Sequence, residues 1–212
     1  PLTALRLRIE SLEDTALARD GDPDAARNDL AAIDGELERL GRMVEGLLAL
    51  ARSESSTTID AVDASIVAAA AVERWGPLAD EQQVTLDLDA AAPKVARVVA
   101  GGLEQMLDNL LDNALGVAPP GSTVELSVGD DDEGVRIAVR DHGPGLSPTD
   151  RARATGRFWR AADASPHGTG LGLAIVAELA AASGGSVALE QPGSGSGLEV
   201  RIVLPRGSDP AN

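Results

Sequence analysis

Two asparagines four residues apart are the first residues in this sequence whose type and spacing could do chemistry. Asn109 and Asn113 stand among leucines in the run Leu107-Asp108-Asn109-Leu110-Leu111-Asp112-Asn113-Ala114. On a helix, both amides project from one face with their Cβ atoms about 5–6 Å apart. Amide oxygens are hard, neutral ligands that can share a magnesium ion with phosphate oxygens. Taken alone, two asparagines on the polar face of an amphipathic helix are more often simply solvated.

A strand that ends in an acid and a glycine turn is the second feature. The sequence there is Val139-Arg140-Asp141-His142-Gly143-Pro144-Gly145. Gly143 and Gly145 allow the backbone to turn and to approach a ligand closely. A carboxylate at the bottom of a pocket, such as that of Asp141, can accept a hydrogen bond from an exocyclic amine like that of adenine. Taken alone, the segment also fits a plain turn, because Gly and Pro are common in loops.

A glycine-rich segment that runs into an apolar helix is the third feature. Gly168-Thr169-Gly170-Leu171-Gly172-Leu173 precedes Ala174-Ile175-Val176, and the polar run 163–167 before it resembles a mobile flap. Glycines leave the first N–H groups of a helix accessible, and the helix dipole favours an anion there. A dinucleotide fingerprint and a P-loop are both excluded, because no βαβ unit and no Gly-Lys-Ser/Thr accompany these glycines. A phosphate site is favoured over a bare helix cap.

Composition limits the classes of protein that can carry these features. The chain has 212 residues, 43% of them hydrophobic, with a formal net charge of −16. That charge argues against a nucleic-acid partner or an anionic membrane surface. The absence of Cys excludes disulfides and thiolate zinc sites, and two histidines are too few for a His-rich metal site. No apolar run approaches the ~20 residues that span a bilayer.

The first fifty residues have a different pattern from the rest and predict a helical hairpin. Apolar residues recur at alternating spacings of three and four in two stretches, Leu2, Leu5, Ile9, Leu12, Ala16 and then Leu30, Ile33, Leu37, Leu40, Val44, Leu47, Ala51. Gly21 can break the first helix, Asp22 can cap the second, and Pro23 suits its first turn. The regular seam favours pairing with a second copy in a four-helix bundle over packing on the downstream domain.

The remaining pattern predicts an α+β domain with one mixed sheet covered by helices. We therefore divide the chain into a hairpin at 1–52, a linker at 53–60, a domain at 61–206 and a tail at 207–212. The predicted helices are 66–75, which Pro77 cannot continue, 102–115 and 172–183. The predicted strands are 84–88, a pair at 123–128 and 135–139 joined by the turn 129–134, and a closing hairpin at 187–190 and 198–204.

Together and in this order, the three features resemble the nucleotide-binding domain of sensor histidine kinases. That domain belongs to the ATPase superfamily shared with gyrase, the heat-shock chaperone ATPases and mismatch-repair proteins. The hairpin resembles the dimerisation domain of the same kinases, so the likeness covers essentially the whole chain. The matching segments are Asn109–Asn113 (asparagine box), Asp141–Gly145 (first glycine box), Arg157–Arg160 (phenylalanine box), Gly168–Leu173 (second glycine box) and Gly195–Leu204 (closing strand).

The resemblance implies a role for each matching residue. Asn113 would coordinate Mg²⁺ on the phosphates of ATP with help from Asn109, and Asp141 would bind the adenine amine. Gly143 and Gly145 would shape the adenine pocket, and Arg157 or Arg160 would offset phosphate charge. The phosphates would lie on the second glycine box under a lid at roughly 161–168, and the residues of that box are Gly168, Thr169, Gly170, Leu171, Gly172 and Leu173.

Several positions depart from the family pattern. The true ATPases of the superfamily carry a Glu four residues before the magnesium Asn, where it activates water. Asn109 stands there in this chain and cannot act as a base, so transfer to a protein side chain is favoured over hydrolysis. Gly116 and Val117 replace a Lys and an aromatic residue, which removes one phosphate contact and one ring beside the nucleoside. Thr155 stands where a Phe is common.

The resemblance implies a homodimeric kinase that passes the ATP γ-phosphoryl group to its own histidine and then to an Asp of a response regulator receiver domain. The segment Pro1–Leu5 resembles the tail of the histidine box, so we expect the acceptor His upstream of Pro1 and no catalytic residue in this sequence. Neither His142 nor His167 fits the acceptor's helical setting. We expect the chain to be the soluble, cytoplasmic portion of a membrane sensor. The alternatives are a degenerate nucleotide-binding dimeric scaffold and an anti-sigma-type serine kinase, which lacks such a hairpin.

Overall fold

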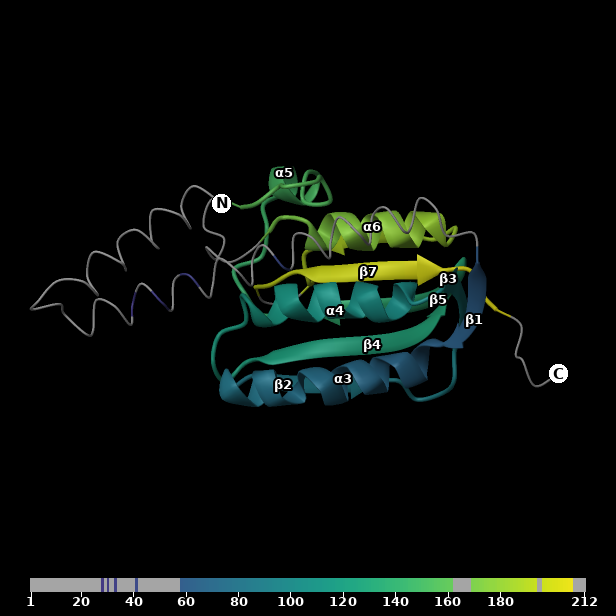
Figure 1. Ribbon diagram of the computed structural model, residues 1–212, viewed down its shortest axis with the longest axis horizontal. Helices are drawn as coiled ribbons and strands as arrows, with labels where there is room; N and C mark the ends of the chain where they lie inside the picture. Colours follow the sequence, from purple (N-terminus) through teal and green to yellow (C-terminus); the bar gives the residue numbers. More distant parts are fainter. Residues whose placement is uncertain are drawn as a thin grey trace, which may run out of the picture.

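The computed structural model describes residues 58–161, 169–193 and 196–207, and four single residues nearer the start, Asn28, Leu30, Ile33 and Gly41. Figure 1 shows helices α3, α4 and α6 side by side over one face of a sheet. The elements are β1 (Ile59–Asp63), α3 (Ala64–Glu81), β2 (Thr85–Asp89), β3 (Val95–Val99), α4 (Gly102–Leu115), β4 (Thr123–Asp131), β5 (Gly134–Arg140), α5 (Pro148–Arg151), α6 (Gly172–Ala182), β6 (Ser186–Glu190) and β7 (Glu199–Leu204).

The main sheet has five strands in the order β2-β4-β5-β7-β6. β2 is parallel to β4 and the other neighbours are antiparallel, so the sheet is mixed. Alternate residues of each central strand are buried against the helices, for example Val124, Leu126 and Val128 of β4. α4 supplies five of the largest fully buried side chains, Leu103, Met106, Leu107, Leu110 and Leu111. The predicted α+β class, with a mixed sheet covered by helices, is confirmed.

A second, two-stranded sheet was not predicted. β1 pairs antiparallel with β3, and β3 leads into α4 through Gly101, which has a left-handed backbone (φ 70°). The buried Oγ of Ser183, at the end of α6, accepts a hydrogen bond from the Val99 N–H at 3.1 Å and donates to the Leu179 carbonyl at 2.7 Å. β3 is therefore attached to one end of α4 and to the far end of α6.

Some predicted boundaries were wrong. α3 does not stop before Pro77 but continues to Glu81, because Ala79 is buried and the Gln82 N–H still bonds to the Leu78 carbonyl. A proline removes one helical hydrogen bond, and packing on both sides can offset that loss. β4 and β5 extend well into the predicted turn at 129–134.

The predicted N-terminal hairpin lies outside the described residues, except for the four single residues named above, which are helical. Leu30, one of its predicted seam residues, is 49% exposed. Within the described part of the chain, no helix combines the length and the apolar character needed to cross a membrane. Because most of the hairpin lies outside the described residues, the predicted domain boundaries stay a prediction.

Replacing Ser183 with Ala tests the link between β3 and α6. The change leaves the buried Val99 N–H without its acceptor, so we expect the free energy of unfolding to fall by about 1–3 kcal/mol. Denaturant titration followed by circular dichroism measures this, with Ser122→Ala as control because the Ser122 hydroxyl is exposed and bonds only to the Pro119 carbonyl. Equal effects of the two substitutions would contradict the proposed link.

Candidate functional site

The first turn of α6 lies directly against the two asparagines of α4. A Cβ built on Gly172 would lie 3.0 Å from Nδ2 of Asn113 and 3.2 Å from Oδ1 of Asn109. Contacts that short are tighter than most, so a side chain at position 172 would push the two amide side chains aside by a few tenths of an ångström. Asn113 is exposed and Asn109 is half-buried. The predicted asparagine pair and the predicted glycine-rich helix start are therefore brought together.

The amide of Asn109 is oriented by its own helix. Its Nδ2 donates a hydrogen bond to the Gln105 carbonyl at 2.8 Å, one turn back along α4. Oδ1 is therefore left on the side that faces Gly172. A side-chain oxygen held in this way is a suitable hard ligand for a magnesium ion. The donor set fits such a cation, with the Asn113 amide beside it.

The start of α6 is open to an anion. Leu171 precedes the helix with no side-chain capping hydrogen bond, and its own N–H donates to Thr169 Oγ1 at 3.3 Å. The next N–H groups have no partner within the helix, and the helix dipole is positive there. Gly170 has φ 69°, and a Cβ on it would lie 2.7 Å from the Trp159 carbonyl oxygen. The arrangement can hold a phosphate group beside the two asparagines.

Asp141 is a buried carboxylic acid, only 6% exposed. Its Oδ1 accepts hydrogen bonds from the N–H of Gly143 at 2.8 Å and of Leu198 at 3.3 Å. Burial raises the pKa of Asp141 above its ordinary value of 3.8, and the two N–H donors and nearby His142 oppose this rise only in part. Both donors use the same oxygen, which leaves Oδ2 to accept a hydrogen bond from a ligand.

Two glycine contacts join the Asp141 loop to its surroundings. A Cβ on Gly143 would lie 2.9 Å from Val117 Cγ2, two residues beyond α4, and 3.0 Å from Asp141 Oδ1. On the other side, Gly145 has φ 71°, and a Cβ there would lie 2.6 Å from the Gly197 carbonyl oxygen. The Asp141 loop therefore packs against the residues that follow α4 on one side and against the Gly197 turn on the other.

Sequence reasoning did not predict the contacts that Gly197, Leu198 and Val117 make with the Asp141 loop, or the bond between Gln105 and Asn109. Gly197 has φ 118°, and a Cβ on it would overlap the Asp141 carbonyl. The Leu198 carbonyl also accepts the Asp141 N–H at 3.0 Å. The glycine run before the last strand was a signal for a close backbone approach, but the partner of that approach becomes visible only in the folded chain.

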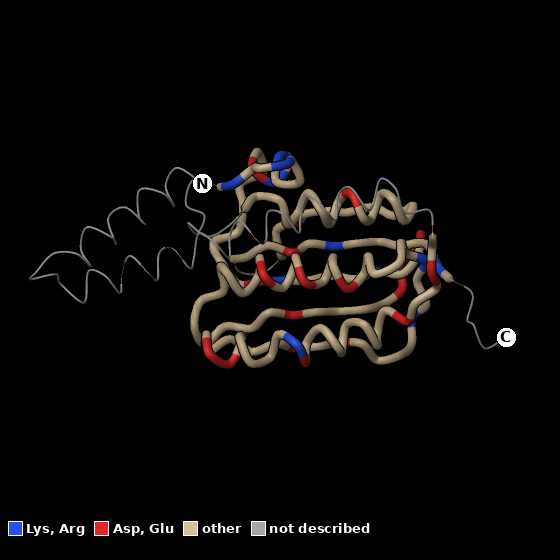
Figure 2. The backbone as a smooth tube through the Cα atoms, viewed as in Figure 1, with Lys and Arg blue, Asp and Glu red and all other residues tan. Residues whose placement is uncertain are grey.

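The predicted cationic residues lie close to the same helix. Figure 2 shows basic residues gathered at α5 and the turn after it, a segment that includes Arg157 and Arg160. The guanidinium of Arg157 lies 3.7 Å from Glu178 of α6, and Cγ of Arg160 would lie 3.1 Å from a Cβ on Gly170. Gly168, His167 and most of the predicted lid lie outside the described residues.

His142 is held against the sheet and does not lie on a helix. Its Nδ1 lies 2.8 Å from the Thr123 carbonyl oxygen, and its Nε2 lies 3.8 Å from Glu125 Oε1. Both partners belong to β4. The imidazole therefore fixes the Asp141 loop to the neighbouring strand.

Two family models match the chain. Residues 99–208 match the model described as "Histidine kinase-, DNA gyrase B-, and HSP90-like ATPase", and residues 1–56 match the "His Kinase A (phospho-acceptor) domain". The sensor-like histidine kinase SenX3 of Mycolicibacterium smegmatis is 36% identical over 95% of this chain and 53% of its own length. The sensor histidine kinase MtrB of Mycolicibacterium paratuberculosis is 32% identical over 98% of this chain and 37% of its own length. This chain thus spans about half of the length of the first relative and about a third of the length of the second.

Solved structures resemble the chain as well. Full-length ShkA, whose crystal structure is in complex with AMPPNP, is 30% identical with a TM-score of 0.70. The match covers 93% of this chain and 41% of ShkA. The Acinetobacter baumannii histidine kinase AdeS has a TM-score of 0.73 at 22% identity, over 98% of this chain and 96% of AdeS, which shows a shared fold.

The raised pKa of Asp141 predicts how stability changes with pH. Between pH 3.8 and the raised value, the folded state binds more protons than the unfolded chain, so stability falls as pH rises through this window. The Asp141→Asn protein has no carboxyl group to ionise at this position, so it does not lose stability in this window. We expect its free energy of unfolding to exceed that of the parent protein at pH 7, with a difference that shrinks towards pH 3.5. Denaturant titrations at three pH values measure this difference. If the free energy of unfolding of the parent protein rose relative to that of Asp141→Asn as pH rises, the raised pKa of Asp141 would be contradicted.

Proposed function

We propose that this chain, which belongs to the family of histidine kinase-, gyrase B- and HSP90-like ATPases, binds Mg-ATP as part of a homodimeric sensor histidine kinase. Residues 1–56, which precede the ATPase match, match the phospho-acceptor domain. The kinase transfers the ATP γ-phosphoryl group to a histidine of the dimerisation helix, for relay to an Asp of a response regulator receiver domain. The observation that carries this proposal is the contact of Gly172 with Asn109 and Asn113. The whole protein is proposed to be a membrane sensor with this chain on its cytoplasmic side.

In this proposal each part of the site holds one part of the nucleotide. The adenine amine donates to Asp141, in a pocket shaped by Gly143 and Gly145. The phosphates bind at the second glycine box, from Gly168 to Leu173, with Arg157 or Arg160 offsetting their charge. Mg²⁺, held by Asn113 with help from Asn109, supplies charge neutralisation when bound. ShkA, which is 30% identical to this chain, has a crystal structure in complex with AMPPNP, which supports nucleotide binding.

Asn109 favours transfer over hydrolysis. A neutral amide cannot take a proton from water, and its Nδ2 is already engaged with the Gln105 carbonyl. In the proposed step, a nitrogen of the accepting imidazole forms a bond to the γ-phosphorus. The bond from that phosphorus to the bridging β–γ oxygen breaks, and ADP leaves. In this proposal, positioning and charge neutralisation carry the catalysis, because Asn109 does not act as a base.

Gly116 and Val117 keep a degenerate, nucleotide-binding scaffold as a second candidate. They stand where the family pattern places a Lys and an aromatic residue, so one phosphate contact and one ring are missing. Val117 is 42% exposed and lies beside Gly143, and its side chain is smaller than that of an aromatic residue. The phospho-acceptor match over residues 1–56 favours the kinase over both this scaffold and a serine kinase.

A transfer assay tests the proposed activity. The chain is mixed with a separate dimerisation hairpin that carries the acceptor His, and with ATP labelled on the γ-phosphate. We expect acid-labile label on the hairpin fragment, none on this chain, and loss of transfer in Asp141→Ala. Label on this chain alone, or release of phosphate without any transfer, would overturn the proposal.

Gly172→Ala tests the site itself. The added methyl group would press on both asparagines, so we expect affinity for a magnesium complex of a non-hydrolysable ATP analogue to fall about tenfold or more, the equivalent of ~1.4 kcal/mol. Isothermal titration calorimetry measures it. Gly76→Ala is the matched control, because a Cβ there meets no atom within 4 Å. Unchanged binding by Gly172→Ala, with Gly76→Ala also unchanged, would remove this contact from the nucleotide site.

A further inference from the structure

Phe158 has a backbone conformation that aromatic residues rarely adopt. Its φ is 63°, in the left-handed region, and among the residues that the structure describes only one other residue besides the glycines has a positive φ. The residue is 58% exposed, so side-chain packing does little to hold it in this conformation. Strain of this kind costs free energy and persists where the surrounding structure requires it. The backbone contacts of Phe158, more than its ring, therefore account for the conformation.

The backbone of Phe158 is bonded to the residues that lead into α6. Its N–H donates a hydrogen bond to the Gly170 carbonyl at 2.9 Å. Gly170 is itself left-handed, with φ 69°, and a Cβ on it would lie 2.7 Å from the Trp159 carbonyl oxygen and 2.9 Å from the Phe158 carbonyl carbon. The two backbone segments therefore pack so closely that position 170 has no room for a side chain.

This hydrogen bond fixes the orientation of the peptide between Gly170 and Leu171. No peptide bond in the described part of the chain is cis, and in a trans peptide the carbonyl and the N–H point in opposite directions. Because the Gly170 carbonyl points to Phe158, the Leu171 N–H points away from it and donates to Thr169 Oγ1 at 3.3 Å. Leu171 directly precedes the first turn of α6. Its N–H therefore joins the N–H groups that are open to an anion there.

The same turn carries the two arginines that were predicted to offset phosphate charge. Arg157 directly precedes Phe158, and its guanidinium lies 3.7 Å from Glu178 of α6. Both side chains of that ion pair are about half exposed, so the pair contributes little to holding the turn in place. The hydrogen bond from Phe158 to Gly170 is the firmer attachment of this turn to the start of α6.

We propose that the backbone of Phe158 positions the peptide between Gly170 and Leu171, and with it the start of α6, for the phosphates of the nucleotide. This role rests on the proposed function, since it requires phosphates to bind at this helix start. Without the bond from Phe158, the peptide is free to rotate and to turn its carbonyl oxygen toward the phosphates in place of its N–H. A carbonyl oxygen there repels an anion. Phe158 is therefore a positioning residue whose ring is not needed for the effect.

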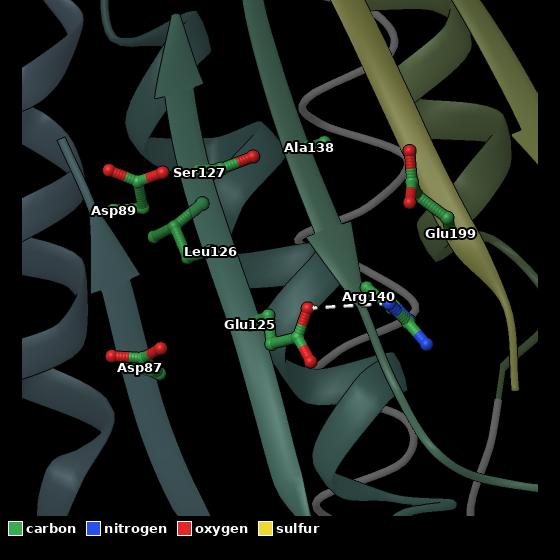
Figure 3. Close-up of a pocket in the computed structure, with 8 residues that line it drawn as sticks. All are labelled: Asp87, Asp89, Glu125, Leu126, Ser127, Ala138, Arg140 and Glu199. Carbon is green, nitrogen blue, oxygen red and sulfur yellow. Dashed lines mark ion pairs between the residues drawn. The ribbon is translucent and has the colours of Figure 1, made fainter. Parts of the chain in front are cut away.

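The hollow on the face of the main sheet away from the helices does not compete for the phosphates (Figure 3). It measures about 220 Å³, and its one lining guanidinium, that of Arg140, lies 3.6 Å from Glu125. The carboxylates that line it outnumber that cation, and they are Asp87, Asp89, Glu125 and Glu199. A change in affinity for a triphosphate therefore reports on the start of α6.

Two substitutions that both remove the ring separate its role from that of the backbone. Asn adopts a left-handed backbone readily, whereas the β-branched Val resists it. We expect Phe158→Asn to bind the magnesium complex of a non-hydrolysable ATP analogue within about twofold of the parent protein, and Phe158→Val to bind it about fivefold more weakly, the effect of one hydrogen bond. Adenosine, which has no phosphates, should bind all three proteins equally. Isothermal titration calorimetry measures both ligands.

Gln83 supplies the matched control, because it is the other described non-glycine residue with a positive φ (59°) and lies between α3 and β2. Gln83→Val imposes the same backbone strain away from α6, so its affinity for the analogue should stay within about twofold of the parent value. Equal affinities of Phe158→Asn and Phe158→Val, or an equal loss in Gln83→Val, would overturn the positioning role. Loss of adenosine binding by Phe158→Val would also overturn it, because the turn would then support the whole domain. A parent protein that does not bind the analogue would overturn the proposed function, and this role with it.

Discussion

The whole site depends on how closely two helices can approach. The first turn of α6 lies so near to α4 that a single methyl group at Gly172 would meet both Asn109 and Asn113. This contact brings an open helix N-terminus, with its partial positive charge, beside two amide oxygens. The rest of the fold holds the pair in place, because α4 contributes five of the largest fully buried side chains and Ser183 attaches the far end of α6 to β3.

The acid at the other end of the site is held at a cost to stability. A buried carboxylate loses hydration, and two backbone N–H groups, those of Gly143 and Leu198, return only part of it. Both donors depend on tight glycine turns, at Gly145 and Gly197, that bring separate loops together. An amide side chain could accept the same two hydrogen bonds without burying a charge. The strand end thus keeps a polar group in an environment that favours its neutral form, as functional sites often do.

Much of this could be predicted from the sequence, for identifiable reasons. The helix at 102–115 was predicted with its observed bounds, because its leucines follow the helical period and glycines flank both ends. β1 and β3 were missed, since two five-residue strands pair with each other through a long sequence separation and leave little periodicity to detect. The order of the asparagine, aspartate and glycine segments was enough to expect one site. The contacts through Val117 and Gly197 could not be predicted, because a glycine in a sequence indicates a close approach but does not identify the residue that approaches it.

The two-stranded sheet is a place where a pulling force on the chain can act on this domain. The Ala100 N–H donates a hydrogen bond to the Thr58 carbonyl at 3.2 Å. Thr58, the first residue of the described domain, is therefore one hydrogen bond from the residues that directly precede α4. β1 continues from there through five register pairs with β3. A force applied along β1 loads those pairs in shear, all at once, and does not peel them apart one by one. Tension arriving at Thr58 is therefore passed to the start of the asparagine helix through β3, and to α3 through the chain that follows β1.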